Sequence, residues 1–188
     1  MKQYQIHEIF YSLQGEGRNT GRAAAFVRFS GCNLRCPFCD TEFDSYRLLT
    51  AEDILTAIEA FPTRFVVLTG GEPTLQADEA FVDLLHQHGY EVAMESNGTR
   101  PAPRNLDWLT VSPKTVPQQM RCNELKLVFT SADSVDTFGI EADYYYLQPC
   151  ATDDDRRNAD ILQACIDYIL QHPQWRLSLQ THKLINIK

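Results

Sequence analysis

The sequence predicts an α/β fold, a shortened, open (partial) TIM-like barrel of about six parallel strands. Apolar runs such as residues 64–69 suit strands that are covered on both faces, as parallel strands are. These runs alternate with helical patterns or long crossovers, which implies parallel pairing with right-handed connections. The chain has 188 residues, whereas a closed eight-fold barrel takes about 250, so an open barrel fits the length better.

The expected elements follow one another closely along the chain. An extended segment over 8–13 breaks at Gly15, and the strand over 24–29 carries Arg28. Thr50 begins a helix over 51–60, because Asp53 at its third position completes a capping box. The other expected strands are 64–69, 90–95, 109–111, 124–129, 144–147 and a final alternating segment over 175–180. Apolar residues at helical spacing predict helices over 77–88 and 157–171.

Composition and charge restrict the function classes. The content of 44% hydrophobic and 22% charged residues is that of an ordinary globular protein, and we expect a single domain over residues 1–188. The net charge of −8 argues against a nucleic-acid partner. No apolar run approaches the roughly 20 residues of a membrane span, and the N-terminus lacks the apolar core of a secretory signal. Six cysteines in such a chain then favour a reducing, cytoplasmic location.

Three of the cysteines lie within eight residues, spaced C-x3-C-x2-C at Cys32, Cys36 and Cys39. Three thiolates suit an iron–sulfur cubane in which one iron has no protein ligand and is open to substrate. The spacing also permits a structural zinc site with a fourth ligand such as His7, or a redox pair of Cys36 and Cys39. A disulfide framework fits poorly, because the spacing is tight and the expected compartment is reducing.

Polar and glycine-containing segments recur where expected strands end. Gly70-Gly71-Glu72 follows the strand over 64–69, and residues 95–99 follow the next strand. Ser112-Pro113-Lys114 and Gln148 occupy two further strand ends. Because ligands bind at the carboxyl ends of parallel strands, these segments predict one binding site.

The cysteine loop over residues 31–41, followed in the chain by the Gly70-Gly71-Glu72 turn, resembles the radical S-adenosylmethionine (SAM) superfamily. The resemblance implies that Cys32, Cys36 and Cys39 hold a [4Fe-4S] cluster whose fourth iron chelates SAM. It also implies that the turn engages the amino group of SAM, and that an external electron donor such as flavodoxin reduces the cluster. We call residues 31–41 the cluster loop.

Within that superfamily the chain resembles the 7-carboxy-7-deazaguanine synthase family from Glu8 to Ile187. The matching segments are Leu13-Gln14-Gly15-Glu16-Gly17, Arg28, Cys39-Asp40-Thr41, Thr69 to Pro73, Ser112-Pro113-Lys114, Gln148-Pro149, and Gln180-Thr181-His182-Lys183 with Asn186-Ile187. The resemblance implies a homodimer of shortened barrels. It implies conversion of 6-carboxy-5,6,7,8-tetrahydropterin to 7-carboxy-7-deazaguanine with loss of ammonia, in queuosine and deazapurine biosynthesis.

The family resemblance also implies individual roles. The expected SAM contacts are Phe38, Cys39, Asp40, Gly71, Ser112, Pro113, Lys114 and Gln148. The expected contacts to the pterin substrate are Leu13, Gln14, Gly15, Arg28, Thr69 and the final residue, Lys188. Thr41 resembles the family's Mg²⁺ ligand. Arg28 suits its role, because a planar guanidinium can bind a carboxylate at two points.

Two other functions fit part of the pattern. A glycyl-radical activase shares the cluster and SAM chemistry but has no place for the motifs at 13–17 and 181–183. A non-catalytic zinc-binding module leaves the glycine turn unexplained. The remaining cysteines, Cys122, Cys150 and Cys165, are expected to be small buried or half-buried thiols.

Overall fold

A computed structural model describes residues 2–39, 42 and 45–188 of the chain. Its strands are β1 (Gln3–Leu13), β2 (Ala23–Phe29), β3 (Arg47–Thr50), β4 (Phe65–Gly70), β5 (Glu91–Ser96), β6 (Trp108–Val111), β7 (Arg121–Phe129), β8 (Glu141–Pro149) and β9 (Trp175–Leu177). Its α-helices are α1 (Ala51–Glu59), α2 (Glu79–Gln87), α3 (Asp155–Gln171) and α4 (Thr181–Leu184).

The strands form one open sheet in the order β3-β1-β2-β4-β5-β6-β7-β8-β9. From β2 to β9 every neighbouring pair is parallel, whereas β1 runs antiparallel to both β2 and β3. The predicted α/β class and open, mostly parallel sheet are confirmed. The expected count of about six parallel strands is too low: seven occur in the described part of the chain, because β9 also pairs in parallel with β8.

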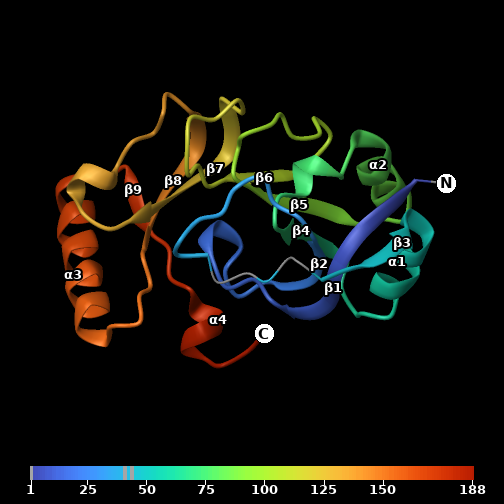
Figure 1. The fold of residues 1–188 in the computed structure, drawn as a ribbon, viewed down its shortest axis with the longest axis horizontal. Coiled ribbons are helices and arrows are strands. Elements are labelled where there is room, and N and C mark those ends of the chain that lie inside the picture. The colour runs from blue at the N-terminus through green and yellow to red at the C-terminus, as the bar shows by residue number, and fades with distance from the viewer. Residues whose placement is uncertain (1, 40–41, 43–44) are drawn as a thin grey trace.

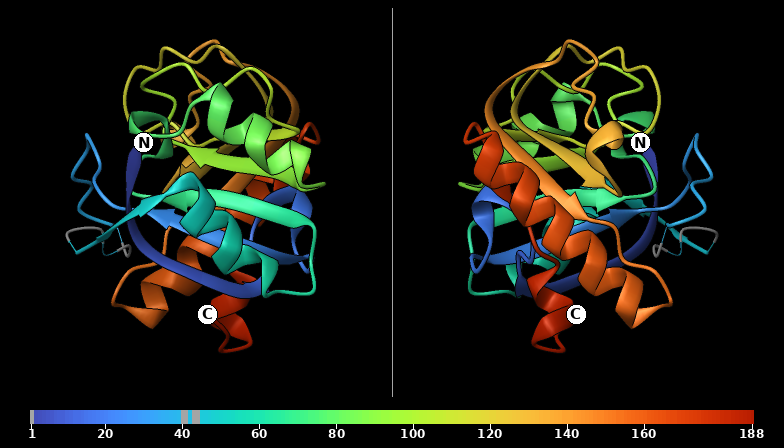
Figure 2. Two further views of the ribbon diagram at one scale, coloured as in Figure 1. Left: turned by 90° about the vertical axis from the view of Figure 1, so that its right-hand side faces the viewer. Right: turned by 90° about the vertical axis from the view of Figure 1, so that its left-hand side faces the viewer.

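The sheet curves, and helices α1, α2 and α3 cover its outer face (Figure 1). Helices α1 and α2 lie over the first strands, and α3 packs along β8 and β9 (Figures 1 and 2). The main core lies between this face and the helices, where Val27 and Leu68 meet helix residues such as Ile58 and Phe81. The C-terminal segment with α4 crosses to the β1 side of the sheet, where the Thr181 N–H donates to the carbonyl of Gly15 at 3.0 Å.

The inner face of the sheet has an apolar base and a polar layer. Ala24, Phe26, Phe65, Val67 and Ala93 form a second, separate apolar cluster. Side chains alternate along a strand, so the residues two positions beyond this cluster share its face. Those residues are Arg28, Thr69 and Glu95. Lys126 and Gln148 lie on the same face, nearer the carboxyl ends of β7 and β8, and we call these five residues the polar layer. The polar layer therefore lies toward the carboxyl ends of the parallel strands.

Helix starts are better predicted than strand lengths. The capping box at Thr50 is confirmed, since its hydroxyl accepts from Asp53 N and the Asp53 carboxylate accepts from Thr50 N. Strand β1 begins five residues before the expected start at residue 8, because it also pairs with β3, a four-residue strand with an exposed start that was not predicted. Strand β9 is shorter than the expected 175–180, because the chain leaves the sheet at Ser178 and enters α4.

Replacement of Thr50 by alanine removes both hydroxyl-dependent bonds of this capping box. We expect Thr50→Ala to lower the free energy of unfolding by about 1 kcal/mol, measured by urea titration. Thr56→Ala on the same helix is the control: its exposed hydroxyl bonds only the carbonyl of Glu52, so a change within about 0.5 kcal/mol is expected. Equal effects of the two substitutions would contradict a specific role of the cap.

Candidate active site

The cluster loop leaves the carboxyl end of β2 and displays its three cysteines beside the glycine turn. Cys32 and Cys36 are half-buried and Cys39 is exposed. The loop is held by its own backbone: Cys39 N donates to the carbonyl of Cys36 at 3.1 Å. The N–H of Leu34 donates to Cys32 Sγ at 3.4 Å, a contact that suits a thiolate.

The two glycines of the turn allow direct backbone packing against the start of this loop. Gly70 has a φ of +125°, and a Cβ there would lie 2.1 Å from the carbonyl oxygen of Phe29. A Cβ on Gly71 would lie 2.1 Å from the carbonyl oxygen of Gly31. Hydrogen bonds from Gly71 N to the Phe29 carbonyl and from Glu72 N to the Gly31 carbonyl close the contact. Any side chain at either position would displace the cluster loop.

Glu72 connects the turn to the end of β5. Its carboxylate is fully buried and accepts hydrogen bonds from Thr74, from Ser96 Oγ at 2.9 Å and from Asn97 N at 2.7 Å. Asn97 then reaches the cluster loop, donating through Nδ2 to Asn33 Oδ1 at 3.1 Å, and Asn33 donates to Thr99 Oγ1. The residues after β5, expected to bind ligand directly, thus also hold the cluster loop.

The three thiols need a cationic partner to be thiolates together. Burial raises the pKa of Cys32, and the charges of Glu72, Cys36 and Cys39 raise it further. An iron–sulfur cubane would be such a partner and would take each thiolate on a different iron. Among the described residues, no three Cys, His, Asp or Glu side chains are arranged to hold a single metal ion.

The expected SAM contacts lie at neighbouring strand ends. Ser112-Pro113-Lys114 follows β6, and Lys114 Nζ donates to the carbonyl of Ser112 at 2.7 Å and to its Oγ at 2.5 Å. Burial and the charge of Lys126 lower the pKa of Lys114 to about 8. Phe38 is exposed beside Cys39. Asp40 and Thr41, the expected SAM and Mg²⁺ residues, lie outside the described residues.

The expected substrate contacts fall into two groups. Arg28 and Thr69 are direct neighbours in the β2–β4 register, and Arg28 Nε donates to Glu8 at 2.9 Å. Lys188 lies in the same group, because its Nζ pairs with Glu8 and its carbonyl accepts from Ser12 Oγ at 2.6 Å.

Leu13, Gln14 and Gly15 form the second group, at the end of β1. Gln14 is buried and Leu13 is exposed. The ring of His182 occupies the space that a Cβ on Gly15 would need.

The sequence reasoning missed the charged centre of the polar layer. Lys126 on β7 is buried, and its ammonium lies 2.6 Å from Glu16 Oε2 and 3.0 Å from Glu95 Oε2. Glu124, two residues earlier, is also buried and accepts from Arg18 N at 2.8 Å. Two opposite charges at alternate positions of the expected strand over 124–129, whose other residues are apolar, were the available signal, because alternation puts both on the inner face.

These carboxylates have unlike protonation equilibria. The pKa of Glu16 falls to about 2 because its pairing with Lys126 outweighs the effect of burial. Burial and the charge of Glu95 raise the pKa of Glu124 to about 7. Burial also raises the pKa of Glu95, although Lys126 opposes that shift. The paired carboxylates in turn hold the pKa of Lys126 above its usual value.

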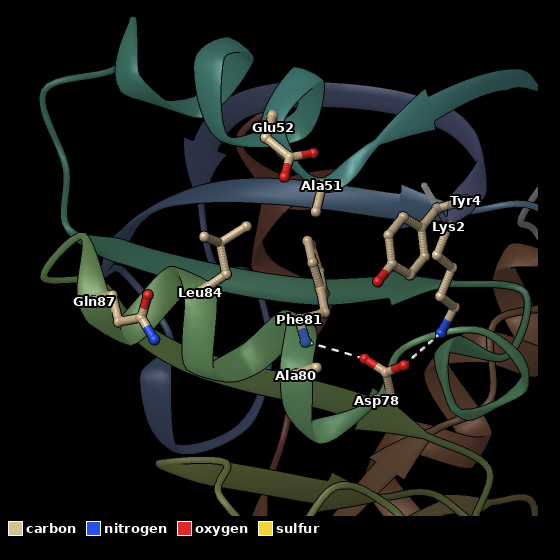
Figure 3. A pocket seen from close by; sticks show the side chains of 9 residues that line it. All are labelled: Lys2, Tyr4, Ala51, Glu52, Asp78, Ala80, Phe81, Leu84 and Gln87. Atoms are coloured by element: carbon tan, nitrogen blue, oxygen red, sulfur yellow. Dashed lines mark hydrogen bonds and ion pairs between the residues drawn. The ribbon is translucent and has the colours of Figure 1, made fainter.

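A separate hollow of about 350 Å³ lies on the helical side of the molecule (Figure 3). Its lining comes from the start of β1 and from α1 and α2, with Tyr4 and Phe81 flanking it and Asp78 bonded to Lys2 at its edge. None of the expected cluster, SAM or substrate residues lines this hollow. The described part of the chain also has no helix long and apolar enough to cross a bilayer.

The backbone contact of the turn gives a direct prediction. We expect Gly71→Ala to retain at most about a tenth of the iron that the unchanged protein takes up on anaerobic reconstitution, because the clash falls on backbone rather than on a movable side chain. Gly21→Ala is the control: nothing lies within 4 Å of a Cβ at Gly21, and its φ of +83° adds a backbone strain that Gly71 does not carry, so strain alone cannot explain a loss in Gly71→Ala. Equal iron content in both variants, measured per folded chain, would contradict the proposed packing.

Comparisons with known proteins agree with this site. The radical SAM superfamily matches residues 26–168. A 7-carboxy-7-deazaguanine synthase from Bacteroides thetaiotaomicron is 45% identical over 186 residues, covering 98% of both chains. One from Bradyrhizobium diazoefficiens is 44% identical, covering 98% of this chain and 99% of its own. The crystal structure of QueE from Escherichia coli superposes with a TM-score of 0.79 at 30% identity, covering 96% of this chain and 95% of that one. The chain therefore belongs to the radical SAM superfamily and, within it, to the family of 7-carboxy-7-deazaguanine synthases.

Proposed function

We propose that this protein is the enzyme that converts 6-carboxy-5,6,7,8-tetrahydropterin to 7-carboxy-7-deazaguanine with loss of ammonia, in queuosine and deazapurine biosynthesis. The similarity to 7-carboxy-7-deazaguanine synthases over 98% of the chain is the main support. The geometry adds that the three-cysteine loop is joined by backbone contacts to the glycine turn at the strand ends next to the polar layer.

Cys32, Cys36 and Cys39 are the proposed ligands of a [4Fe-4S] cluster. When bound, the reduced cluster and SAM would supply the one-electron chemistry that removes a hydrogen atom from the substrate. The chain itself orients SAM through the other proposed contacts, which are Phe38, Asp40, Gly71, Ser112, Pro113, Lys114 and Gln148. Lys114 supports this assignment, because it provides a half-buried ammonium at a strand end, and Cys36 is among the groups that influence its pKa.

The pterin is proposed to lie over the inner face of the sheet. Arg28 would bind its carboxylate, while Leu13, Gln14, Gly15, Thr69 and Lys188 would complete the contacts. The Arg28 side chain is only 21% exposed and its Nε already bonds Glu8, so the guanidinium is oriented before substrate arrives. Thr41 is the proposed protein ligand of Mg²⁺, which commonly keeps few protein ligands and takes others from substrate and water.

We infer one domain over residues 1–188, a homodimer, and reduction of the cluster by an external donor such as flavodoxin. A cytoplasmic location is part of the proposal, because the three cluster thiols must stay reduced. Sedimentation of the reconstituted enzyme measures the assembly, and a mass equal to one chain would reject the dimer.

The two other candidate functions have less support. The glycyl-radical activase leaves the contacts of residues 14–18 with β7 unexplained, and the zinc module lacks a convergent donor set among the described residues.

The decisive experiment is anaerobic reconstitution with iron and sulfide, followed by SAM, reductant and the carboxypterin. We expect 5′-deoxyadenosine and 7-carboxy-7-deazaguanine as products. Alanine at Cys32, Cys36 or Cys39 is expected to abolish the visible cluster absorption and both products, whereas Cys150→Ala, outside the cluster loop, is expected to keep them. Formation of 5′-deoxyadenosine without deazapurine would reject the proposed substrate. The absence of both products would reject the radical SAM activity.

The proposed magnesium ligand is tested separately. We expect Thr41→Ala to need at least about tenfold more Mg²⁺ for half-maximal product formation, because one protein ligand is lost. Thr41→Ser is the matched control, since it keeps the hydroxyl and should respond to Mg²⁺ like the unchanged enzyme. A rate that is the same in chelator-treated enzyme with and without Mg²⁺ would reject the magnesium site.

A further inference from the structure

We propose that Lys126 is a positioning residue, whose ammonium holds Glu16 and Glu95 so that together they fix the side-chain amide of Gln14 in one orientation. This inference rests on the proposed function, in which Gln14 contacts the pterin. Lys126 itself lies behind the two carboxylates and has no proposed contact with substrate or SAM.

The ammonium of Lys126 lies between two carboxylates. Lys126 projects from β7 and bridges two segments that are far apart in the sequence, at 2.6 Å from Glu16 and 3.0 Å from Glu95. Its side chain is only 5% exposed. Water therefore does little to screen these pairs. The ammonium keeps Glu16 ionised and opposes the rise that burial causes in the pKa of Glu95.

Glu95 and Glu16, the two partners of Lys126, both contact the side-chain amide of Gln14. Glu95 Oε1, the oxygen that Lys126 does not bind, accepts from Gln14 Nε2 at 3.3 Å. The backbone N–H of Glu16 donates to Gln14 Oε1 at 3.2 Å. An ionised Glu95 can only accept, so Nε2 must face it, while a backbone N–H can only donate, so Oε1 must face that group. The two contacts leave the amide a single orientation.

Glu16 also accepts hydrogen bonds on its other carboxylate oxygen. Its Oε1 accepts from Gln148 Nε2 at 3.2 Å and from Gln180 Nε2 at 3.0 Å. Gln148 in turn accepts from Ser178 Oγ at 3.0 Å. Lys126 thereby connects the segment after β1 to β5, β8 and the residues before α4, and the Gln14 amide depends on the whole network.

Without the Lys126 charge, the network has an excess of negative groups. Glu95 is faced by the carboxylates Glu16 and Glu124 and by the ammoniums of Lys114 and Lys126, and His182 faces Glu16. Removing Lys126 leaves Glu95 buried beside two carboxylates, which raises its pKa. A protonated Glu95 can donate as well as accept, so it no longer requires Nε2 of Gln14 to face it, and the contact with Glu16 N alone orients the amide.

The test compares Lys126→Met, which keeps a side chain of similar length, with Lys2→Met, which removes an exposed charge on the far side of the molecule. Binding of 6-carboxy-5,6,7,8-tetrahydropterin to the SAM-loaded, reconstituted enzyme is measured without reductant from pH 7 to pH 9. We expect Lys126→Met to bind at least about tenfold more weakly at pH 7 and to recover part of that loss as the pH rises, because a higher pH favours the ionised form of Glu95. The Lys2 variant should follow the unchanged enzyme throughout.

A direct readout of Gln14 makes the inference independent of pterin binding. In ¹⁵N-labelled protein, the carboxamide signals of Gln14, assigned by their loss in Gln14→Ala, should shift and exchange faster with water in Lys126→Met. Unchanged Gln14 signals, or a binding loss that is the same at every pH, would overturn the positioning role. If even the unchanged enzyme fails to bind the pterin, the proposed function fails, and the Gln14 signals alone decide the inference.

Lys126→Met leaves buried carboxylates without their cation, so folding is checked by urea titration. The double variant Lys126→Met with Glu95→Gln also removes the Glu95 carboxylate, one of the two that Lys126 paired with, and is expected to fold. Because the amide introduced at position 95 can either donate or accept, this variant should bind weakly at every pH and show a mobile Gln14 amide. Binding within twofold of the unchanged enzyme would overturn the inference.

Discussion

The close packing of two backbones, at the ends of β2 and β4, is the constraint on which the site depends. The strands are parallel and in register, with Phe29 opposite Gly70, so their carboxyl ends lie side by side. Gly70 and Gly71 then pass so near the carbonyls of Phe29 and Gly31 that neither could carry a Cβ. Because the crowded atoms belong to the backbone, no change of rotamer could relieve a clash. The start of the cluster loop is thus placed by backbone packing that requires two glycines, and the side-chain bond between Asn97 and Asn33 holds the loop farther along.

Strand alternation extends that local constraint into a site with two environments. One set of residues meets the helices, and the other lines the inner face, where an apolar base around Phe26, Phe65 and Val67 excludes water. The next inward position on each strand is polar and lies toward the carboxyl ends of the strands. The low polarity of the base strengthens the interactions of the charges just beyond it. The same geometry that packs the core therefore also concentrates the polar groups beside the cluster loop.

The sequence predicts the fold class and the strand-end motifs because both depend on local patterns. The capping box at Thr50, the apolar run ending at Thr69 and the cysteine spacing each need only a few neighbouring residues. The strand β3 could not be found this way, because its pairing with β1 depends on residues more than forty positions away. The same limit applies to Lys126: its strand is predicted, but its partners Glu16 and Glu95 come from distant segments that only the folded sheet brings together.

The buried charges of this layer are poorly explained by stability alone. Removing an ammonium and carboxylates from water costs several kcal/mol for each ion, and apolar residues of similar volume are often at least as stable in such places. Here Lys126 is shared between Glu16 and Glu95, while Glu124, with its pKa raised to about 7, can keep its proton near neutral pH and so limit the excess of negative charge. The charges of these buried side chains thus nearly cancel, and each hydrogen bond fixes a group near the strand ends. Such an arrangement is costly for a scaffold but suited to a site that must hold polar groups in place before substrate arrives.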